Sequence, residues 1–264
     1  MGLKIAVAGK GGVGKTTVAG SLARLFGRDG LNVFAIDADP SMNLYKALGI
    51  PRENMKTITP ISEMNDLVEE RTGVKPGSLG GVFILNPKVS DIPDRFKVTG
   101  PDGVHLLVMG TVTQPSGGCM CPSNALIRAL LSHIILKRDE VVVLDMEAGI
   151  EHLGRGTAKG VDAMLIVVEP GSRSLDLARR IKELAEGLVK KLFIVGNKVS
   201  NEEEAKFLEK ASKDLGLELI ALIPYDREII KADLQDAAPL DVAPDSASIK
   251  QIMKIKERLE KELV

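Results

Sequence analysis

The chain has 264 residues, and 44% of them are hydrophobic, so it can bury a sizeable core and is not a disordered protein. Its 35 Lys and Arg residues balance 36 Asp and Glu residues, for a net charge of −1. This balance argues against nucleic acid as a main partner, because nucleic-acid-binding proteins usually carry a basic excess. The N-terminal segment is too short and too interrupted by glycine for a secretory signal, and no apolar run approaches the roughly 18 residues of a membrane span. We therefore expect a cytoplasmic protein with no membrane partner.

Short apolar runs rich in Val and Ile recur along the chain, and they predict strands that are buried on both faces, as in a parallel sheet. They cover residues 3–9, 31–37, 104–110, 141–147, 164–170, 192–198 and 217–223. Segments with helical periodicity lie between them, at residues 15–29, 124–137, 173–188 and 202–215. This order predicts an α/β fold with a doubly wound, mostly parallel sheet, whose functional residues gather at the carboxyl ends of the strands.

Two segments depart from this alternation. Residues 74–103 are irregular and contain several Gly and Pro residues, so we interpret them as an excursion or small hairpin within a single domain that spans residues 1–264. Residues 248–264 carry Ile and Leu on one side, which predicts a closing helix packed on the sheet. Acidic residues and the lack of aromatic residues argue against a membrane-surface anchor there.

The segment AGKGGVGKTT follows the first predicted strand and fits two different nucleotide motifs. Gly9, Gly11 and Gly14 satisfy the dinucleotide pattern G-x-G-x-x-G. Gly9, Gly14, Lys15 and Thr16 satisfy the P-loop pattern G-x-x-x-x-G-K-[ST]. Lys15 and Thr16 decide between them, because a triphosphate with Mg²⁺ needs an ammonium and a hydroxyl there and a dinucleotide does not. The sequence therefore predicts a P-loop NTPase that binds ATP and Mg²⁺.

In a P-loop, glycines let backbone N–H groups converge on the phosphates, and the following helix adds its positive N-terminal end. Lys15 supplies a charge to the β- and γ-phosphates and acts in catalysis, and Thr16 supplies an oxygen to Mg²⁺. The predicted nucleotide-binding residues of this segment are Gly11, Gly12, Val13, Gly14, Lys15, Thr16 and Thr17.

A second lysine, Lys10, stands at the start of the loop. Alone it would be interpreted as a surface charge. The pattern GKGGVGKTT, however, resembles the deviant Walker A ATPases, which include nitrogenase iron protein, MinD and ArsA. This resemblance implies that Lys10 reaches across a homodimer to the ATP of the partner and is catalytic there, like an arginine finger supplied in trans.

Carboxylates follow two of the predicted strands. Asp37 and Asp39 stand in DADPSMN, which could be an ordinary turn. The resemblance gives Asp39 the role of orienting the attacking water and places Asp37 nearer the metal. Asp145 ends an apolar strand and suits a Walker B role toward Mg²⁺ through its waters. Residues 145–149 would then form switch II, with Gly149 as a possible hinge.

Two later strand ends suit the nucleobase. The amide of Asn197 offers both a donor and an acceptor to a base edge, and the resemblance assigns that edge to adenine. Pro224 and Asp226 form a Pro-x-Asp after the last predicted strand, a pattern that lines the base pocket in related ATPases.

The chain has two cysteines, Cys119 and Cys121, separated by one residue in PSGGCMCPSN. A disulfide between them would close a tight and strained ring. Buried inert thiols do not fit a loop marked by Gly117, Gly118 and Pro122, and no local Cys-His signature supports a nucleophile. A metal or cluster site remains, and the predicted helix N-terminus after the cysteines favours the thiolates that it needs.

One chain supplies only two sulfurs. A Cys₄ site for Ni²⁺ or Zn²⁺ therefore needs a homodimer in which the two CxC pairs face each other. The resemblance to the deviant Walker A ATPases, in which Lys10 acts across a dimer, implies the same homodimer. Its formation would depend on nucleotide, on metal or on both.

Five segments together resemble the CooC family, ATPases that mature carbon monoxide dehydrogenase by delivering nickel to its active-site cluster. They are GKGGVGKTT, DADP, NPKVSDIPDRF, CMCPSNALIRALL and DMEAGIEHLGRG. The resemblance implies an ATP-hydrolysing metallochaperone with carbon monoxide dehydrogenase as its client. It also implies that Cys119 and Cys121 bind Ni²⁺ or Zn²⁺ between protomers, while His152 would be structural or sensing.

Other functions remain open at this point. One alternative is an iron–sulfur scaffold or electron-donor ATPase of the same superfamily, and another is a membrane-positioning ATPase like MinD. The sequence also leaves open which metal is native, whether it is cargo or a structural clamp, and whether ATP binding or hydrolysis drives dimerisation.

Overall fold

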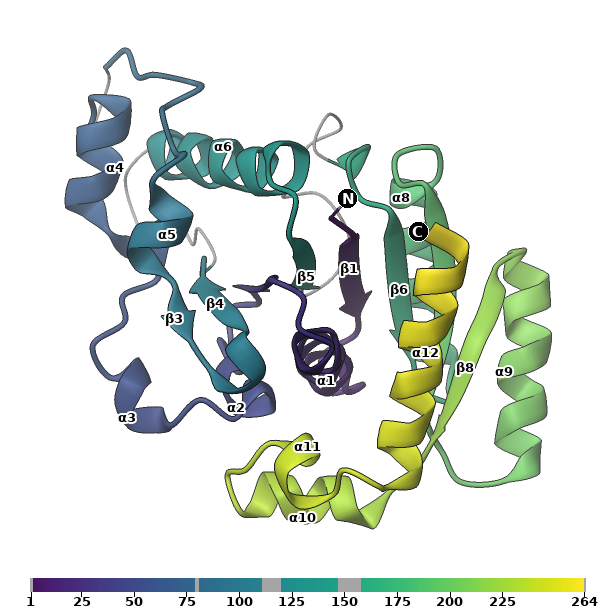
Figure 1. The fold of residues 1–264 in the computed structure, drawn as a ribbon. Helices are drawn as coiled ribbons and strands as arrows, with labels where there is room; N and C mark the ends of the chain where they lie inside the picture. Colours follow the sequence, from purple (N-terminus) through teal and green to yellow (C-terminus); the bar gives the residue numbers. More distant parts are fainter. Residues whose placement is uncertain (1, 79–80, 111–119, 147–157, 264) are drawn as a thin grey trace.

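The computed structural model describes residues 2–78, 81–110, 120–146 and 158–263. Their strands form one eight-stranded sheet in the order β3-β4-β2-β5-β1-β6-β7-β8 (Figure 1). Only β3 runs antiparallel to its neighbour, and every other pair is parallel. The strands are β1 (Lys4–Gly9), β2 (Val33–Ala38), β3 (Val98–Thr99), β4 (His105–Val108), β5 (Val141–Met146), β6 (Ala163–Val168), β7 (Lys191–Val199) and β8 (Glu218–Pro224).

The predicted doubly wound α/β sheet is confirmed. Every predicted strand exists, and its ends agree with the sequence analysis to within two residues. The agreement has a physical reason, because the central strands are covered on both faces. All six residues of β1, and likewise all six of β5, are buried. Such strands need continuous apolar runs.

Helices cover both faces of the sheet (Figure 1). Two hydrophobic cores lie between the helices and the sheet. One core includes residues of α4 (Asn65–Thr72), α6 (Cys121–Lys137), α8 (Ser172–Ala185) and α9 (Glu202–Leu215). The other includes residues of α1 (Lys15–Arg28), α2 (Leu44–Leu48), α11 (Pro239–Val242) and α12 (Ala247–Leu263). The predicted closing helix is α12, and its buried residues Ile249, Ile252, Ile255 and Leu259 face the second core. None of the described helices is long and apolar enough to cross a membrane.

Short helices were not predicted, because one or two turns carry too little periodicity to be recognised. They are α2, α3 (Arg52–Met55), α4, α5 (Ile92–Phe96), α10 (Arg227–Leu234) and α11, with 3₁₀ turns at Ile61–Glu63 and Pro101–Gly103. The irregular segment 74–103 does end in a small hairpin, since β3 pairs with β4 across the second of these turns. Its apolar run is not a strand, and Val82, Ile84 and Leu85 are exposed.

The parallel register brings the predicted site residues to one edge of the sheet. Because β2, β5, β1 and β7 run in the same direction, their carboxyl ends lie together. Asp37 on β2 is the register partner of Asp145 on β5. The glycine loop leaves β1 at this edge, and Asn197 lies near the end of β7.

Candidate nucleotide site

The glycine loop runs from β1 into α1, and two of its glycines have a left-handed backbone. Gly12 has φ 82° and Gly14 has φ 94°. A Cβ on Gly14 would lie only 2.3 Å from Asn197 Nδ2, so no other residue fits there. Gly14 is also the N-cap of α1, and the first turn of that helix contains no acidic residue. The positive end of α1 therefore faces an anion site that glycine keeps accessible.

A cavity of about 750 Å³ opens above this loop. From the loop and α1 it is lined by six of the residues predicted to bind nucleotide, Gly11, Gly12, Gly14, Lys15, Thr16 and Thr17. Val13 differs, because its side chain is fully buried in the second core and only its backbone can face a ligand. Asp39 and Ser41 line the cavity from the segment after β2. Its size falls within the usual range for small-molecule sites.

Lys15 and Asp39 form a buried ion pair in this cavity, with Nζ 2.6 Å from Oδ2. The other oxygen of Asp39, Oδ1, accepts hydrogen bonds from the hydroxyl and the backbone N–H of Ser41, at 2.5 and 2.9 Å. Burial works to raise the pKa of Asp39, but the hydrogen bonds from Lys15 and Ser41 outweigh it and the pKa lies below its usual value. Asp39 is thus ionised and held against the P-loop lysine.

Asp37 is buried one residue before the end of β2, and both of its oxygens accept backbone hydrogen bonds. They come from the N–H of Asp39 at 3.2 Å and of Leu44 at 3.0 Å. Burial raises the pKa of Asp37 to about 6 despite these bonds. Asp37 therefore anchors the segment that carries Asp39, and its predicted place near the metal stays a prediction.

Asp145 lies beside Asp37 and is equally buried, but it differs from Asp37 in its hydrogen bonds. Both of its carboxylate oxygens are buried, and neither has a hydrogen-bond partner among the described residues. Burial raises the pKa of Asp145 to about 7, against the lowering effect of the nearby Thr16 hydroxyl. A buried carboxylate without partners is costly unless a cation compensates it. Asp145 and Thr16 therefore fit Mg²⁺, a cation that prefers oxygen ligands and is often shared with phosphates.

No described cluster of three or more His, Cys, Asp or Glu side chains could hold a metal ion by itself.

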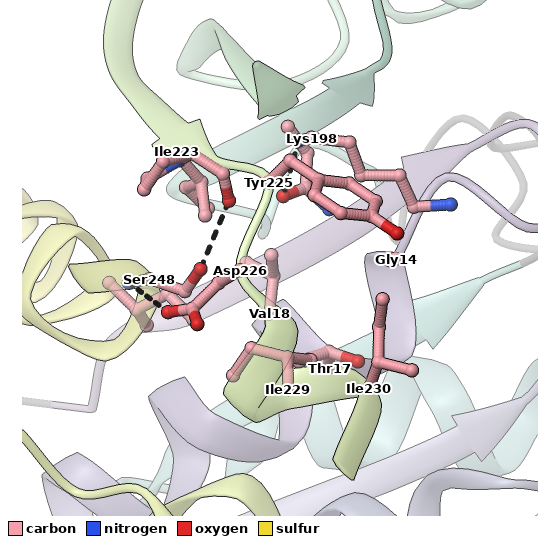
Figure 2. Close-up of a pocket in the computed structure, with 13 residues that line it drawn as sticks. Gly14, Thr17, Val18, Lys198, Ile223, Tyr225, Asp226, Ile229, Ile230 and Ser248 are labelled. Atoms are coloured by element: carbon pink, nitrogen blue, oxygen red, sulfur yellow. Dashed lines mark hydrogen bonds between the residues drawn. The ribbon is translucent and has the colours of Figure 1, made fainter. Parts of the chain in front are cut away.

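A smaller hollow of about 90 Å³ adjoins the cavity (Figure 2). The two share Gly14, Thr17, Lys198, Ile229 and Ile230 along their border. Ile223 from β8 and Ile252 from α12 add apolar walls to the smaller hollow, and Tyr225 lies at its rim with about half of its surface exposed. The two spaces form one groove: the larger cavity beside the glycine loop is its polar half, and the smaller hollow with its isoleucine walls is its apolar half.

The predicted base residues all line this apolar half, but their polar groups are already engaged. Asn197 Nδ2 donates to the carbonyl of Val13 at 2.7 Å, and its Oδ1 accepts from the N–H of Lys198 at 2.9 Å. Asp226 caps α10 by accepting from the N–H of Glu228 at 3.0 Å. In this structure the side chains of Asn197 and Asp226 hydrogen-bond to the backbone around the groove, and their contacts to adenine stay predictions.

Lys198 is a groove residue that the sequence analysis missed. It has a left-handed backbone, φ 58°, and its Nζ donates to the carbonyl of Gly12 at 2.6 Å. The side chain thus crosses from the end of β7 to the glycine loop, and it lines both halves of the groove. Lys198 directly follows the predicted base residue Asn197, and this was the one sequence signal for a role at the site. A single lysine at a strand end matches no nucleotide-binding motif.

Lys10 lies at the rim of the site. Its Nζ is 3.7 Å from Glu169 Oε1, and 41% of its side chain is exposed. The same glutamate is 3.9 Å from Lys198 Nζ. A long ion pair at a solvated position is weak, so Lys10 is only loosely held within its own chain.

The cysteine segment is partly within the described residues. Cys121 is the first residue of α6 and is exposed, with Pro122 directly after it, so the predicted helix N-terminus is confirmed. Cys121 is disulfide-bonded in the structure. Cys119, Gly149 and His152 also lie outside them, so the predictions made for these residues are not tested.

A glycine loop beside a cavity, with a lysine and a threonine at a helix N-terminus and an acid on a neighbouring strand, defines a P-loop nucleoside triphosphatase. Residues 4–240 match the model of the CobQ/CobB/MinD/ParA nucleotide binding domain. The chain is 48% identical to the carbon monoxide dehydrogenase accessory protein CooC of Rhodospirillum rubrum, over 92% of this chain and 91% of that one. It belongs to the CooC family of the MinD/ParA superfamily and is an ATPase.

Other relatives agree with this assignment. The chain is 47% identical to an uncharacterised ATP-binding protein of Methanocaldococcus jannaschii, over 96% of each chain. The septum site-determining protein MinD of Pyrococcus horikoshii, solved with Mg-ADP, superposes with a TM-score of 0.69 at 20% identity, covering 99% of this chain and 97% of that one. At that identity the match shows the shared fold alone.

Proposed function

We propose that this protein is an ATP-driven accessory protein that helps to insert nickel during maturation of carbon monoxide dehydrogenase. The observation that carries the proposal is the similarity to CooC along almost the whole of both chains. A CxC pair at the start of α6 supports it, because soft thiolates suit nickel or zinc as cargo or as a clamp.

The ATPase part of the proposal rests on groups of this chain. An entering triphosphate brings its own negative charge to Lys15 and so competes with Asp39 for that lysine. Once displaced, Asp39 can accept a hydrogen bond from the attacking water. Thr16 and Asp145 would hold Mg²⁺, which when bound supplies charge neutralisation at the β- and γ-oxygens.

The dimer part of the proposal rests on Lys10 and on the cysteines. The side chain of Lys10 is partly exposed, and within the described part of the chain its ion pair is a long contact with Glu169, so it can turn toward a second protomer at small cost. Cys119 and Cys121 supply two sulfurs, and a four-coordinate site needs two more. A second copy of the chain meets both needs at once.

The metal part of the proposal requires reduced thiols, because the thiolate is the metal ligand. Residues at the first turn of α6 sit at the positive end of a helix dipole, which stabilises a thiolate there. Metal loading therefore requires Cys121 in its reduced form.

Metal analysis of protein purified anaerobically with reductant tests this function. We expect about one Ni²⁺ or Zn²⁺ per two chains, lost in Cys121→Ser and in Cys119→Ser, with ATP changing the occupancy. Nickel-dependent activation of nickel-free carbon monoxide dehydrogenase should need ATP and fail with either variant. A broad visible absorption typical of an iron–sulfur cluster would contradict the nickel function and favour the scaffold alternative.

A further inference from the structure

Hydrogen bonds from the first turn of α12 hold one wall of the apolar half of the groove in place (Figure 2). Ser248, the second residue of α12, is 3% exposed and lines the hollow. Its hydroxyl donates to the carbonyl of Pro224 at 3.1 Å, and its backbone N–H donates to Asp226 Oδ2 at 3.1 Å. One serine thus holds both ends of residues 224–226, which run from the last residue of β8 to the N-cap of α10.

The carboxylate of Asp226 joins two helices. Its Oδ1 accepts from Glu228 N–H at the start of α10, while its Oδ2 accepts from Ser248 N–H at the start of α12. Burial works to raise the pKa of Asp226, but these backbone hydrogen bonds outweigh it, and the pKa lies below its usual value. The carboxylate is thus charged and acts as a shared cap for both helices.

The two helices that share this cap are the walls of the hollow. Ile229 and Ile230 belong to α10, and Ile252 belongs to α12. The spacing between these apolar side chains is therefore set by the contacts of Asp226 and Ser248. A planar ring fits between such walls only when their separation is maintained, because contact energy falls steeply with a gap of even 0.5–1 Å.

We infer that Ser248 is a positioning residue for the base of the nucleotide: by holding Pro224 and Asp226 it fixes the α10 and α12 walls of the base pocket. The inference rests on the groove being the ATP site of the proposed function. The hydrogen bonds of Ser248 go to Pro224 and Asp226 and not to a phosphate-binding residue. Its effect belongs to the base half of the groove alone.

Ser248→Ala tests this inference, because it removes the hydroxyl and keeps the backbone N–H that donates to Asp226. We expect the KM for ATP to rise about fivefold, the effect of one lost hydrogen bond, with kcat within about twofold of wild type. Affinity for tripolyphosphate, which has no base, should not change. Ser248→Thr keeps a hydroxyl and should restore much of the ATP affinity.

Ser212→Ala is the matched control. Ser212 is also a buried serine, and its hydroxyl also donates to a backbone carbonyl, that of Glu209 on α9, away from the groove. This variant should lose comparable thermal stability and keep the wild-type KM. If it raised the KM as much as Ser248→Ala does, the effect would be general loosening and the inference would be wrong.

The remaining outcomes distinguish a failure of the role inferred for Ser248 from a failure of the proposed ATP site. An unchanged KM in Ser248→Ala, or an equal loss of ATP and tripolyphosphate affinity, would overturn the inference and leave the ATP site intact. Wild-type protein that bound tripolyphosphate but did not bind ATP would refute the base pocket itself, and the inference with it.

Discussion

Lys15 Nζ lies 2.6 Å from Asp39 Oδ2, and both side chains are more than nine-tenths buried. The lysine that should hold the phosphates is therefore neutralised by the residue that should orient the attacking water. To reach Lys15, a triphosphate must displace the carboxylate of Asp39 and put a phosphate in its place. In the proposed function, this exchange would couple nucleotide binding to release of Asp39, so that Asp39 would become available only when substrate is present.

Asp39→Asn should separate binding from hydrolysis. The variant lacks the charge that competes for Lys15, so ATP should bind as tightly as to wild type or more tightly. Hydrolysis should fall by at least about a hundredfold, because a group that acts on the reacting water is lost. Equilibrium binding of a non-hydrolysable ATP analogue and single-turnover hydrolysis measure the two effects. Asp233→Asn, an acid that lines the same cavity from α10, should change neither. Weaker binding by Asp39→Asn would contradict the competition.

Asp145→Asn should stabilise the protein while it disables the site. Both carboxylate oxygens are buried without partners among the described residues, so a neutral amide relieves a desolvation cost. We expect a Tm higher by about 2–4 °C for each kcal/mol gained, in the absence of ligand. The further rise in Tm that MgADP gives to wild type should be lost. Asp162→Asn is the contrasting control, because Asp162 accepts from the N–H of Lys4 and from Lys190 and its loss should lower the Tm. A lower ligand-free Tm in Asp145→Asn would refute the interpretation.

The sheet and the phosphate half of the site could be predicted because their signals are local. A strand such as β1 is buried on both faces and must be apolar throughout, and a P-loop needs glycines at fixed distances from Lys15 and Thr16. Gly14 illustrates why the pattern needs glycine, because a Cβ at this position would lie 2.3 Å from Asn197 Nδ2.

The base half could not be predicted to the same depth, because its order arises from tertiary contacts. The helix α10 is only eight residues long, and Ser248 contacts a segment more than twenty residues away in sequence. Asp226 lines the apolar half of the groove, but its carboxylate also caps two helices, and no sequence pattern predicts that. Lys198 was missed for the same reason, since its partner Gly12 lies 186 residues earlier.

Lys198→Met should weaken ATP and tripolyphosphate alike. The ammonium donates to the carbonyl of Gly12, so its loss loosens the glycine loop that both ligands share. A charged hydrogen bond is worth about 1.5–3 kcal/mol, which predicts a loss of roughly tenfold or more in affinity for each ligand. Isothermal titration with both ligands measures this. Lys191→Met, at the other end of β7 and paired with Glu262, should leave both affinities unchanged. A loss confined to ATP would place Lys198 with the base and not with the loop.

The stability conferred by Asp94 should disappear in acid. Hydrogen bonds from Arg138 and Lys97 hold the pKa of Asp94 at about 2, below its ordinary value of 3.8. The unfolded chain therefore binds more protons between these values, and the stabilisation present above pH 4 is lost as the pH falls toward 2. Because Asp94 is largely exposed, the effect is below about 1 kcal/mol. Urea unfolding of Asp94→Asn should show a deficit at pH 7 that narrows toward pH 3.5. Asp214→Asn, at an exposed position on α9, should show no such trend, and a constant deficit in Asp94→Asn would exclude the ion pair as its cause.

Lys10 can be tested by mixing two inactive proteins. Lys10→Ala lacks the lysine that would serve the partner, and Lys15→Ala lacks the lysine of its own P-loop. In a mixed dimer, the site of the Lys10→Ala protomer would receive Lys10 from the other chain and become active. Equal mixing should therefore restore about a quarter of wild-type ATPase activity, since about half of the dimers are mixed and each has one competent site. Mixing Lys15→Ala with Asp39→Asn is the control, because both residues act within their own chain and no activity should return. Full activity of Lys10→Ala alone, or no recovery on mixing, would show that Lys10 does not act in trans.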